Sequence, residues 1–227
     1  MRPEVRISDQ LTEDGARLLA EAANRGGHLV LTGGSTPKAA YSRVAELGAD
    51  WSGAEVWFSD ERCVPPDHEH SNFGMAHEAL LSKIETRAVH RMQGERGPQD
   101  GAREYGKEVA AAFGEDTIPE FDFILLGLGP DAHIASLFPN NPELGIRDKP
   151  VAGVEQPGMA PLLPRITLTL PPLNAGPRVV LLVSGEDKAE AVARAVKGRP
   201  GPEAPASLLQ PRGEFVLLCD AAAAARL

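Results

Sequence analysis

Short apolar runs alternate along the chain with amphipathic segments of helical period. Nearly continuous apolar runs at residues 28–31, 55–58, 123–128, 178–183 and 214–219 predict buried strands, because a sheet covered on both faces leaves no polar side to its strands. Helical periodicity or helix-start residues mark 11–23, 36–47, 73–84, 99–113 and 184–198. Strands that alternate with helices predict an α/β fold: a mostly parallel, doubly wound, Rossmann-like sheet flanked by helices on both faces.

Two regions depart from this simple alternation. Residues 165–170 alternate between apolar and polar side chains in the manner of a further strand. Residues 139–164 are rich in proline and glycine with weak periodicity, and leave room for an additional hairpin. No repeat or domain-length linker interrupts the 227 residues, so residues 1–227 are expected to form one domain.

Two helix starts have recognisable sequence signals. Thr36 followed by Pro37 predicts a helix with a hydroxyl at the N-cap and proline at the first helical position. Ser184 with Asp187 three residues later has the spacing of a capping box, and the helix it opens is expected to end at Gly198.

Composition excludes several classes of function. A net charge of −9 and an aromatic content of 5% disfavour a nucleic-acid-binding protein, and an acidic protein that binds an anion needs a local cationic pocket. No apolar run has membrane-spanning length and no targeting segment is evident. Cys63 and Cys219 form no CxxC pair, which argues against a disulfide framework or a zinc site. We therefore expect a cytoplasmic protein with no membrane partner.

The turn after residues 123–128 contains the sharpest candidate chemistry. Gly127, Gly129 and Pro130 end the strand, and Asp131 and His133 follow where an open α/β sheet has its ligand crevice. Imidazole titrates near neutral pH, so His133 is suited to take a proton from water while Asp131 orients it. The alternative is structural: Asp131 caps a short helix and His133 packs at its start.

The same turn formally matches a dinucleotide-binding pattern. Residues 127–132 read GLGPDA, which satisfies GxGxxG/A. The pattern requires a following helix and a strand that ends in an acid, whereas an irregular connection follows here, and Asp131 would repel a pyrophosphate. We therefore expect no nicotinamide or flavin cofactor.

Three further stretches could bind an anion. Residues 33–37, GGSTP, combine flexible backbone, hydroxyls and a helix N-terminus, which suits either a phosphate site or an ordinary strand-to-helix turn. Arg62 ends the triplet Asp60-Glu61-Arg62 at a strand terminus, so it is either a pocket cation or part of a solvated charge cluster. Lys188 in the first turn of its helix opposes the macrodipole, which suggests a bound anion, and the alternative is a solvated lysine.

Other catalytic classes lack their motifs. There is no GxSxG elbow of a serine esterase, and His68, His70 and His77 do not have zinc-ligand spacing. No carboxylate cluster has the pattern of a magnesium site. The chemistry is therefore expected to need neither metal nor cofactor.

Five ordered segments together resemble the 6-phosphogluconolactonases: LTGGSTP at 31–37, FSDERCVPPDHEHSN at 58–72, FDFILLGLGPDAHIASLFP at 121–139, RITLTLPPLNAG at 165–176 and SGEDKAEAV at 184–192. The resemblance implies a fold akin to that of glucosamine-6-phosphate deaminase. It also implies hydrolysis of 6-phospho-D-glucono-1,5-lactone to 6-phospho-D-gluconate in the oxidative pentose phosphate pathway, by a monomer or weak homo-oligomer.

The resemblance also assigns roles to residues. It implies that His133 is the general base, with Asp131 beside it, and that Arg62 holds substrate charge. It implies that the phosphate contacts are Gly34, Ser35, Thr36, Lys188 and, as an addition, Arg165, which opens the RITLT strand.

One departure from the family pattern concerns the catalytic turn. The family usually has Asp-Gly-His where this chain has Ala132 in the middle, so a positive φ there would cost about 1 kcal/mol and could displace the histidine.

Two alternative functions remain beside the lactonase. One is the sister deaminase, disfavoured because Arg62 stands where that enzyme has tyrosine and because residues 136–139, SLFP, lack its Phe-Asn-Glu sequence. The other is a non-catalytic sugar-phosphate-binding protein.

Overall fold

The centre of the molecule is a seven-stranded parallel sheet. The computed structural model describes residues 2–227. The strand order is β1-β10-β9-β6-β2-β3-β5, and every paired strand in this sheet is parallel. The strands are β1 (Glu4–Ile7), β2 (Gly27–Leu31), β3 (Ala54–Phe58), β5 (Ala88–Val89), β6 (Phe123–Leu126), β9 (Arg178–Val183) and β10 (Glu214–Cys219).

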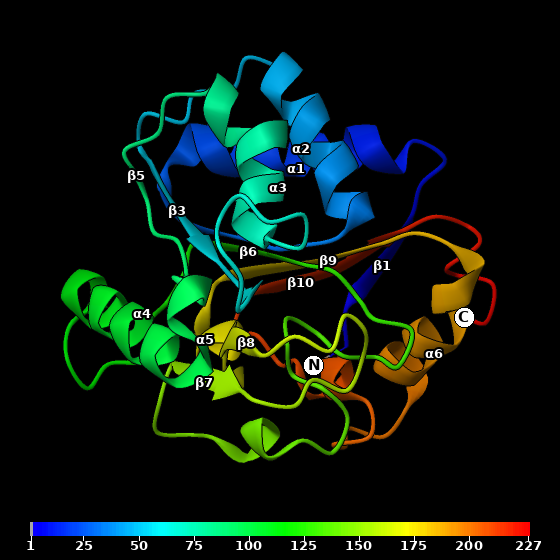
Figure 1. Ribbon diagram of the computed structural model, residues 1–227. Helices are drawn as coiled ribbons and strands as arrows, with labels where there is room; N and C mark the ends of the chain where they lie inside the picture. The colour runs from blue at the N-terminus through cyan, green and yellow to red at the C-terminus, as the bar shows by residue number, and fades with distance from the viewer. Residues whose placement is uncertain (1) are drawn as a thin grey trace.

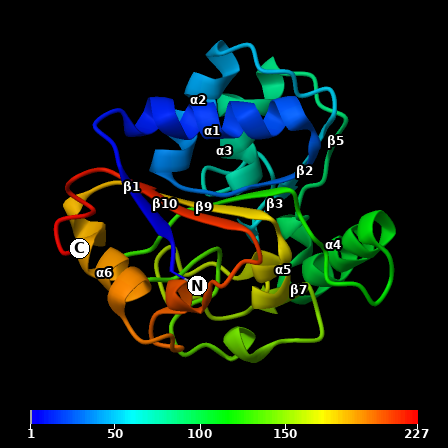
Figure 2. The ribbon, with the colours of Figure 1, turned by 180° about the vertical axis from the view of Figure 1, so that it is seen from behind.

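Helices cover both faces of this sheet, which confirms the doubly wound α/β prediction (Figures 1 and 2). One face carries α1 (Leu11–Arg25), α2 (Ser35–Glu46) and α3 (Asn72–Ala79). The opposite face carries α4 (Pro98–Phe113), α5 (Leu170–Ala175) and α6 (Ala189–Lys197).

The alternation of side chains along the strands builds two separate cores. Leu29 and Leu31 of β2 point to the side of α1 and α2, where they join the buried ring of Tyr41. Val30 points to the opposite side, where it packs with Trp57 and the α4 side. Because both faces are apolar, the strands show continuous hydrophobic runs, as the sequence predicted.

A second, three-stranded antiparallel sheet lies on the α4 side. Its order is β4-β8-β7, formed by β4 (Asp60–Arg62), β7 (Val151–Val154) and β8 (Arg165–Leu168). Residues 139–164 contain one additional strand, β7, and not the whole hairpin expected there, since its antiparallel partner is β8, which follows that segment. The strand expected at 165–170 exists, but it pairs with β4 and not within the main sheet, since non-local pairing is invisible to local periodicity.

Both N-cap predictions were wrong, whereas Gly198 ends α6 as predicted. Gly34, with φ of 110°, is the N-cap of α2 and makes no side-chain cap, so Thr36 lies inside the helix. The Ser184 hydroxyl donates to the Asp220 carboxylate at 2.6 Å, and a 3-10 turn (Glu186–Lys188) precedes α6. The local sequence pattern predicted that the Ser184 hydroxyl caps its own helix, but it bonds instead to Asp220, which is distant in sequence.

The order of the strands creates a crevice at the centre of the sheet. From β2 the chain continues outward through β3 and β5, and from β6 it continues outward in the other direction through β9 and β10. The carboxyl ends of the adjacent strands β2 and β6 therefore lie at a topological switch point, where connections leave in opposite directions. Open α/β sheets bind their ligands at this place.

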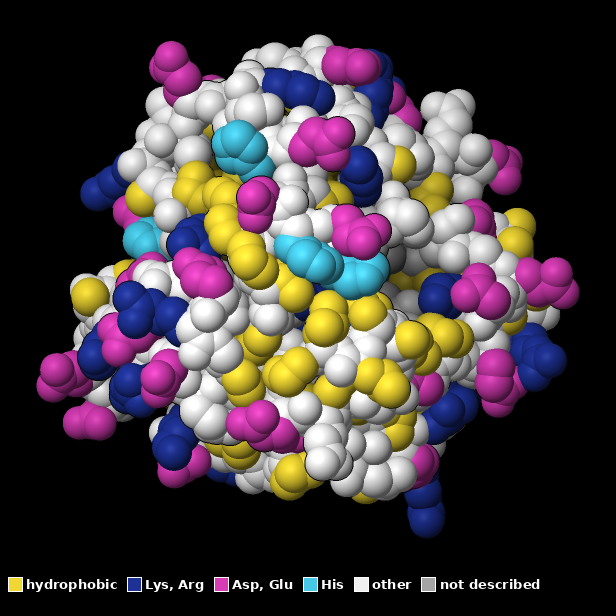
Figure 3. Space-filling view, viewed as in Figure 1, with side chains coloured by type: hydrophobic (Ala, Val, Ile, Leu, Met, Phe, Trp, Pro, Cys, Tyr) yellow, Lys and Arg dark blue, Asp and Glu magenta, His cyan; other side chains and the backbone are white. Residues whose placement is uncertain are grey.

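The surface view shows no large gathering of one charge. On the face seen in Figure 3, Lys and Arg side chains are interspersed with Asp and Glu.

Within residues 2–227, none of the helices combines the length and the apolar character needed to cross a membrane.

Candidate active site

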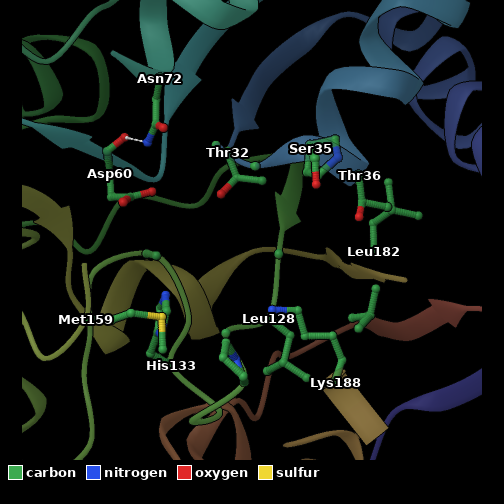
Figure 4. A pocket seen from close by; sticks show the side chains of 18 of the residues that line it. Thr32, Ser35, Thr36, Asp60, Asn72, Leu128, His133, Met159, Leu182 and Lys188 are labelled. Carbon is green, nitrogen blue, oxygen red and sulfur yellow. Dashed lines mark hydrogen bonds between the residues drawn. The ribbon is translucent and has the colours of Figure 1, made fainter. Parts of the chain in front are cut away.

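A pocket of about 210 Å³ opens at this switch point (Figure 4). Its walls come from the residues that follow β2, β6 and β9, together with β4 and the start of α3. The predicted site residues that line it are Gly34, Ser35, Thr36, Arg62, His133, Arg165 and Lys188. Asp131 stands behind His133 and does not line the pocket.

The Asp131 carboxylate holds the His133 imidazole in one orientation. Asp131 Oδ1 lies 2.6 Å from His133 Nδ1 and also accepts a hydrogen bond from the His133 backbone N–H at 3.1 Å. A carboxylate at Nδ1 favours the tautomer with the proton on Nδ1, which leaves Nε2 unprotonated. The ring of Phe138 supports the imidazole at a centroid distance of 4.7 Å. This arrangement presents an oriented imidazole to the pocket.

The charge of Asp131 is maintained within this pair. Burial raises the pKa of Asp131, but the hydrogen bonds and the charge of His133 outweigh it and leave the pKa below its usual value. An ionised Asp131 beside Nδ1 would stabilise a protonated His133.

Gly129 gives the pair the space it occupies. A Cβ at this position would lie 2.0 Å from His133 Nδ1 and 2.7 Å from Asp131 Oδ1. Any larger residue would therefore displace the imidazole or its partner, so the glycine before Pro130 is required by a close approach and not by its own φ.

Ala132 has the positive φ that the sequence argument anticipated. Its φ is 69°, and it is fully buried. The turn nonetheless closes, because the Ala132 N–H donates to Gly129 O at 2.9 Å and the Ala206 N–H donates to Ala132 O at 3.0 Å. Since His133 keeps its 2.6 Å contact with Asp131, alanine has not displaced the histidine.

The turn between β2 and α2 forms the opposite end of the pocket. Gly34 is the N-cap of α2, and Ser35 and Thr36 begin the helix. The N–H groups of this first turn have no intrahelical acceptor, and the turn contains no acidic residue. Thr32, directly after β2, is held by the buried Tyr41 hydroxyl, which accepts from the Thr32 N–H and donates to the Thr32 carbonyl. This geometry suits a phosphate group.

Lys188 reaches the same end of the pocket from the start of α6 (Figure 4). Its ammonium lies 3.1 Å from the carboxylate of Asp187, which is mostly exposed. An exposed ion pair of this kind is weak, so the lysine can exchange it for a more highly charged anion in the pocket.

The two arginines of the pocket differ in their free donors. Arg62 donates Nη1 to the carbonyl of His70 at 2.7 Å, while its buried Nε has no partner within residues 2–227. Arg165 donates Nε to Leu163 O and Nη2 to Pro161 O, and burial lowers its pKa. Arg62 thus has more donor capacity for a ligand, whereas Arg165 mainly anchors the loop before it.

The structure adds pocket residues to which the sequence analysis assigned no role. Asp60 and Asn72 form one wall, and the Asp60 carboxylate accepts from the hydroxyls of Ser59 and Ser136 at 2.9 and 2.6 Å. Met159 lies beside His133 in Figure 4. The strand-end position of Asp60 was a usable signal, but nothing in the irregular segment around Met159 marks it.

Two other predictions concern bound groups. After the GLGPDA turn the chain forms an isolated bridge between Ile134 and Leu137 and no helix, so the requirement for a dinucleotide site is not met. Among residues 2–227, no three His, Cys, Asp or Glu side chains are arranged to hold a metal ion.

The alternative that Asp60-Glu61-Arg62 forms a solvated charge cluster was wrong, since Asp60 and Glu61 are buried.

Comparison with known proteins agrees with this geometry. The family model described as glucosamine-6-phosphate isomerases/6-phosphogluconolactonase matches residues 4–218. A 6-phosphogluconolactonase of Streptomyces coelicolor is 37% identical over 222 residues, covering 92% of this chain and 85% of that protein. The human 6-phosphogluconolactonase is 40% identical over 170 residues, covering 74% of this chain and 66% of that protein.

Solved structures show the same fold. A 6-phosphogluconolactonase from Trypanosoma brucei superimposes with a TM-score of 0.89 at 26% identity, over 100% of this chain and 99% of that one. A monomeric glucosamine-6-phosphate deaminase, at 20% identity and a TM-score of 0.82 over the whole of both chains, shares the fold alone. This chain belongs to the glucosamine-6-phosphate isomerase/6-phosphogluconolactonase family.

Proposed function

We propose that this protein hydrolyses 6-phospho-D-glucono-1,5-lactone to 6-phospho-D-gluconate, as a step of the oxidative pentose phosphate pathway, with His133 as the general base. The observation that carries the proposal is the 2.6 Å contact between His133 Nδ1 and Asp131 in a pocket whose other end is a helix N-terminus with Lys188. Relatives named 6-phosphogluconolactonase support the choice of substrate.

The reaction requires few groups because a lactone is an activated ester. His133 Nε2 takes a proton from water as the water oxygen bonds to the lactone carbonyl carbon. Arg62 stabilises the negative charge on the carbonyl oxygen. When the tetrahedral intermediate collapses, the bond from this carbon to the ring oxygen breaks, and the imidazolium returns its proton to that oxygen. The carboxylic acid product then ionises.

The phosphate of the substrate contributes to catalysis through position. Its contacts with the N–H groups of Ser35 and Thr36 and with Lys188 hold the ring at a fixed distance from His133. Binding energy from a remote group can in this way be used to orient the reacting carbon. Arg165 supports the pocket wall and has one free nitrogen, Nη1, for the ligand.

The test is the release of 6-phosphogluconate from freshly prepared lactone, measured above the spontaneous rate with a chelator present. We expect His133→Ala to lower kcat by about 10² to 10⁴ with little change in KM, which is the usual contribution of a general base. His77→Ala, at an exposed histidine of α3, is the matched control and should keep the wild-type rate.

Other outcomes have distinct meanings. A fully active His133→Ala protein would remove this residue as the base. A rate abolished by the chelator would show that a metal is needed. A wild type without any rate above background would remove the lactonase proposal, and glucosamine 6-phosphate would be the next substrate tested. Binding of sugar phosphates without turnover of either substrate would identify a binding protein.

A further inference from the structure

We infer that Glu61, which does not line the pocket, is a positioning residue that fixes Arg62 and Asn72 in the pocket wall. The inference rests on the proposed function for its assay. It starts from β4, where side chains alternate between the two sides of the strand. Asp60 and Arg62 line the pocket, and Glu61 between them points toward α3.

The Glu61 carboxylate accepts four hydrogen bonds, one from within β4 and three that join β4 to the beginning of α3. Oε1 accepts from the backbone N–H groups of Arg62 and Asn72, each at 2.7 Å. Oε2 accepts from the Ser71 hydroxyl at 2.9 Å and from the Phe73 N–H at 2.8 Å. All four partners donate, so the deprotonated carboxylate fits the site.

This carboxylate is an unusual anchor because it is buried. Glu61 is 2% exposed, and burial raises its pKa while the four donors oppose the rise. Two of the donors, the N–H groups of Asn72 and Phe73, are free groups at the N-terminus of α3, where a negative charge is favourable. The Ser71 hydroxyl also accepts from the Gly74 N–H at 3.0 Å, which completes the cap.

The four bonds determine the position of two pocket side chains. They close the loop between β4 and α3, so that the His70 carbonyl accepts from Arg62 Nη1 at 2.7 Å. They also place Asn72, whose Nδ2 donates to Asp60 O at 2.9 Å, as Figure 4 shows. A Cβ on Gly33 would lie 2.0 Å from Asn72 Oδ1, so Asn72 also rests directly against the turn before α2.

Replacement of the carboxylate should therefore act through the pocket. In Glu61→Gln one acceptor oxygen becomes an NH₂ group that faces backbone or hydroxyl donors, so at least one of the bonds is lost. Arg62 and Asn72 are then free to shift. A displacement of about 1 Å at a positioned group can lower the rate about 10²-fold.

The experiment is a double-mutant cycle on lactone hydrolysis. We expect Glu61→Gln to lower kcat about 10- to 100-fold with KM changed less than about threefold, because Arg62 acts on charge that develops in the transition state. In an Arg62→Ala background the same substitution should lower kcat further by less than about threefold, since residues that act through each other are not additive.

A matched control separates positioning from general stability. Tyr105→Phe removes a buried hydroxyl that bonds the backbone of Phe58 at 2.9 and 3.3 Å, outside the pocket. It should lower the melting temperature, as is also expected of Glu61→Gln, and keep the wild-type kcat. All rates are compared per folded protein, measured by near-UV circular dichroism.

Each remaining outcome decides the inference. A Glu61→Gln protein with wild-type kcat would overturn it, and so would a loss of equal size in the wild-type and Arg62→Ala backgrounds. A wild type without lactone turnover would remove the proposed function first. Affinity for 6-phosphogluconate by calorimetry would then replace kcat in the same cycle, and unchanged or additive affinities, or no binding by the wild type, would overturn the inference.

Discussion

Replacement of Gly129 by alanine tests how far catalysis depends on the Asp131–His133 geometry. Gly129 does not have a positive φ, so an alanine fits its backbone conformation. The added methyl would lie 2.0 Å from His133 Nδ1 and 2.2 Å from Cε1. The substitution therefore displaces the imidazole while it leaves every catalytic group chemically intact.

The size of the effect follows from these distances. Real Cβ atoms essentially never approach another atom closer than 3.0 Å, so the ring or the turn has to move by about 1 Å. The 2.6 Å contact with Asp131 cannot survive such a shift in its present geometry. We expect kcat to fall about 10²-fold with KM nearly unchanged, because the phosphate end of the pocket is untouched.

The assay is steady-state lactone hydrolysis for wild type, Gly129→Ala and Gly106→Ala. Gly106 lies within α4, where a Cβ would meet nothing within 4 Å. The control should keep the wild-type kcat and gain about 0.5–1 kcal/mol of unfolding free energy, as alanine is favoured over glycine in a helix. A Gly129→Ala enzyme that folds with a wild-type kcat would refute the reasoning.

Three further predictions concern charge and backbone. Lys188→Ala should raise KM about 10- to 100-fold by the loss of a charged phosphate contact, whereas Lys197→Ala at the exposed end of α6 should not; an unchanged KM for both would contradict the assigned role. Ala132→Gly relieves the strain of a positive φ, about 1 kcal/mol, but loses the burial of a methyl group, about 0.8 kcal/mol. The free energy of unfolding in urea should therefore change by less than about 0.5 kcal/mol, and kcat should stay within about threefold of the wild type. For His90, burial lowers the pKa, but hydrogen bonds and charges of Glu108 and Glu55 outweigh it and raise the pKa above 6.5. The stabilisation is thus fully present below pH 6.5 and lost as the pH rises through the folded-state pKa, so His90→Gln should lower the unfolding free energy more at pH 5.5 than at pH 8.5; an equal loss at both would refute this.

Much of the fold was predictable because its elements are locally determined. Continuous apolar runs identified five of the seven strands of the main sheet, since burial on both faces leaves a signal within each segment, whereas the edge strands β1 and β5 were not predicted. The crevice rule then placed His133 and Arg62 at the same edge before any contact was known. The sequence resemblance added Gly34, Ser35, Thr36 and Lys188, which all line one pocket.

What local patterns could not determine were contacts between segments far apart in the chain. The Ser184 hydroxyl bonds Asp220 instead of its own helix, and β8 pairs with β4, about a hundred residues earlier. Met159 enters the pocket from an irregular segment without any periodicity. Such partners depend on the folded arrangement of the whole chain.

The sequence by itself determined most of the helices, five strands of the parallel sheet and the end of that sheet where a ligand crevice is expected, because hydrophobic period and chain connectivity are local properties. Only the tertiary structure decided the role of each polar group. Glu61 and Arg62 are neighbours in the chain, but one is a buried anchor and the other lines the pocket. That division arises because successive side chains of a strand point to opposite sides, and only packing decides what lies on each side.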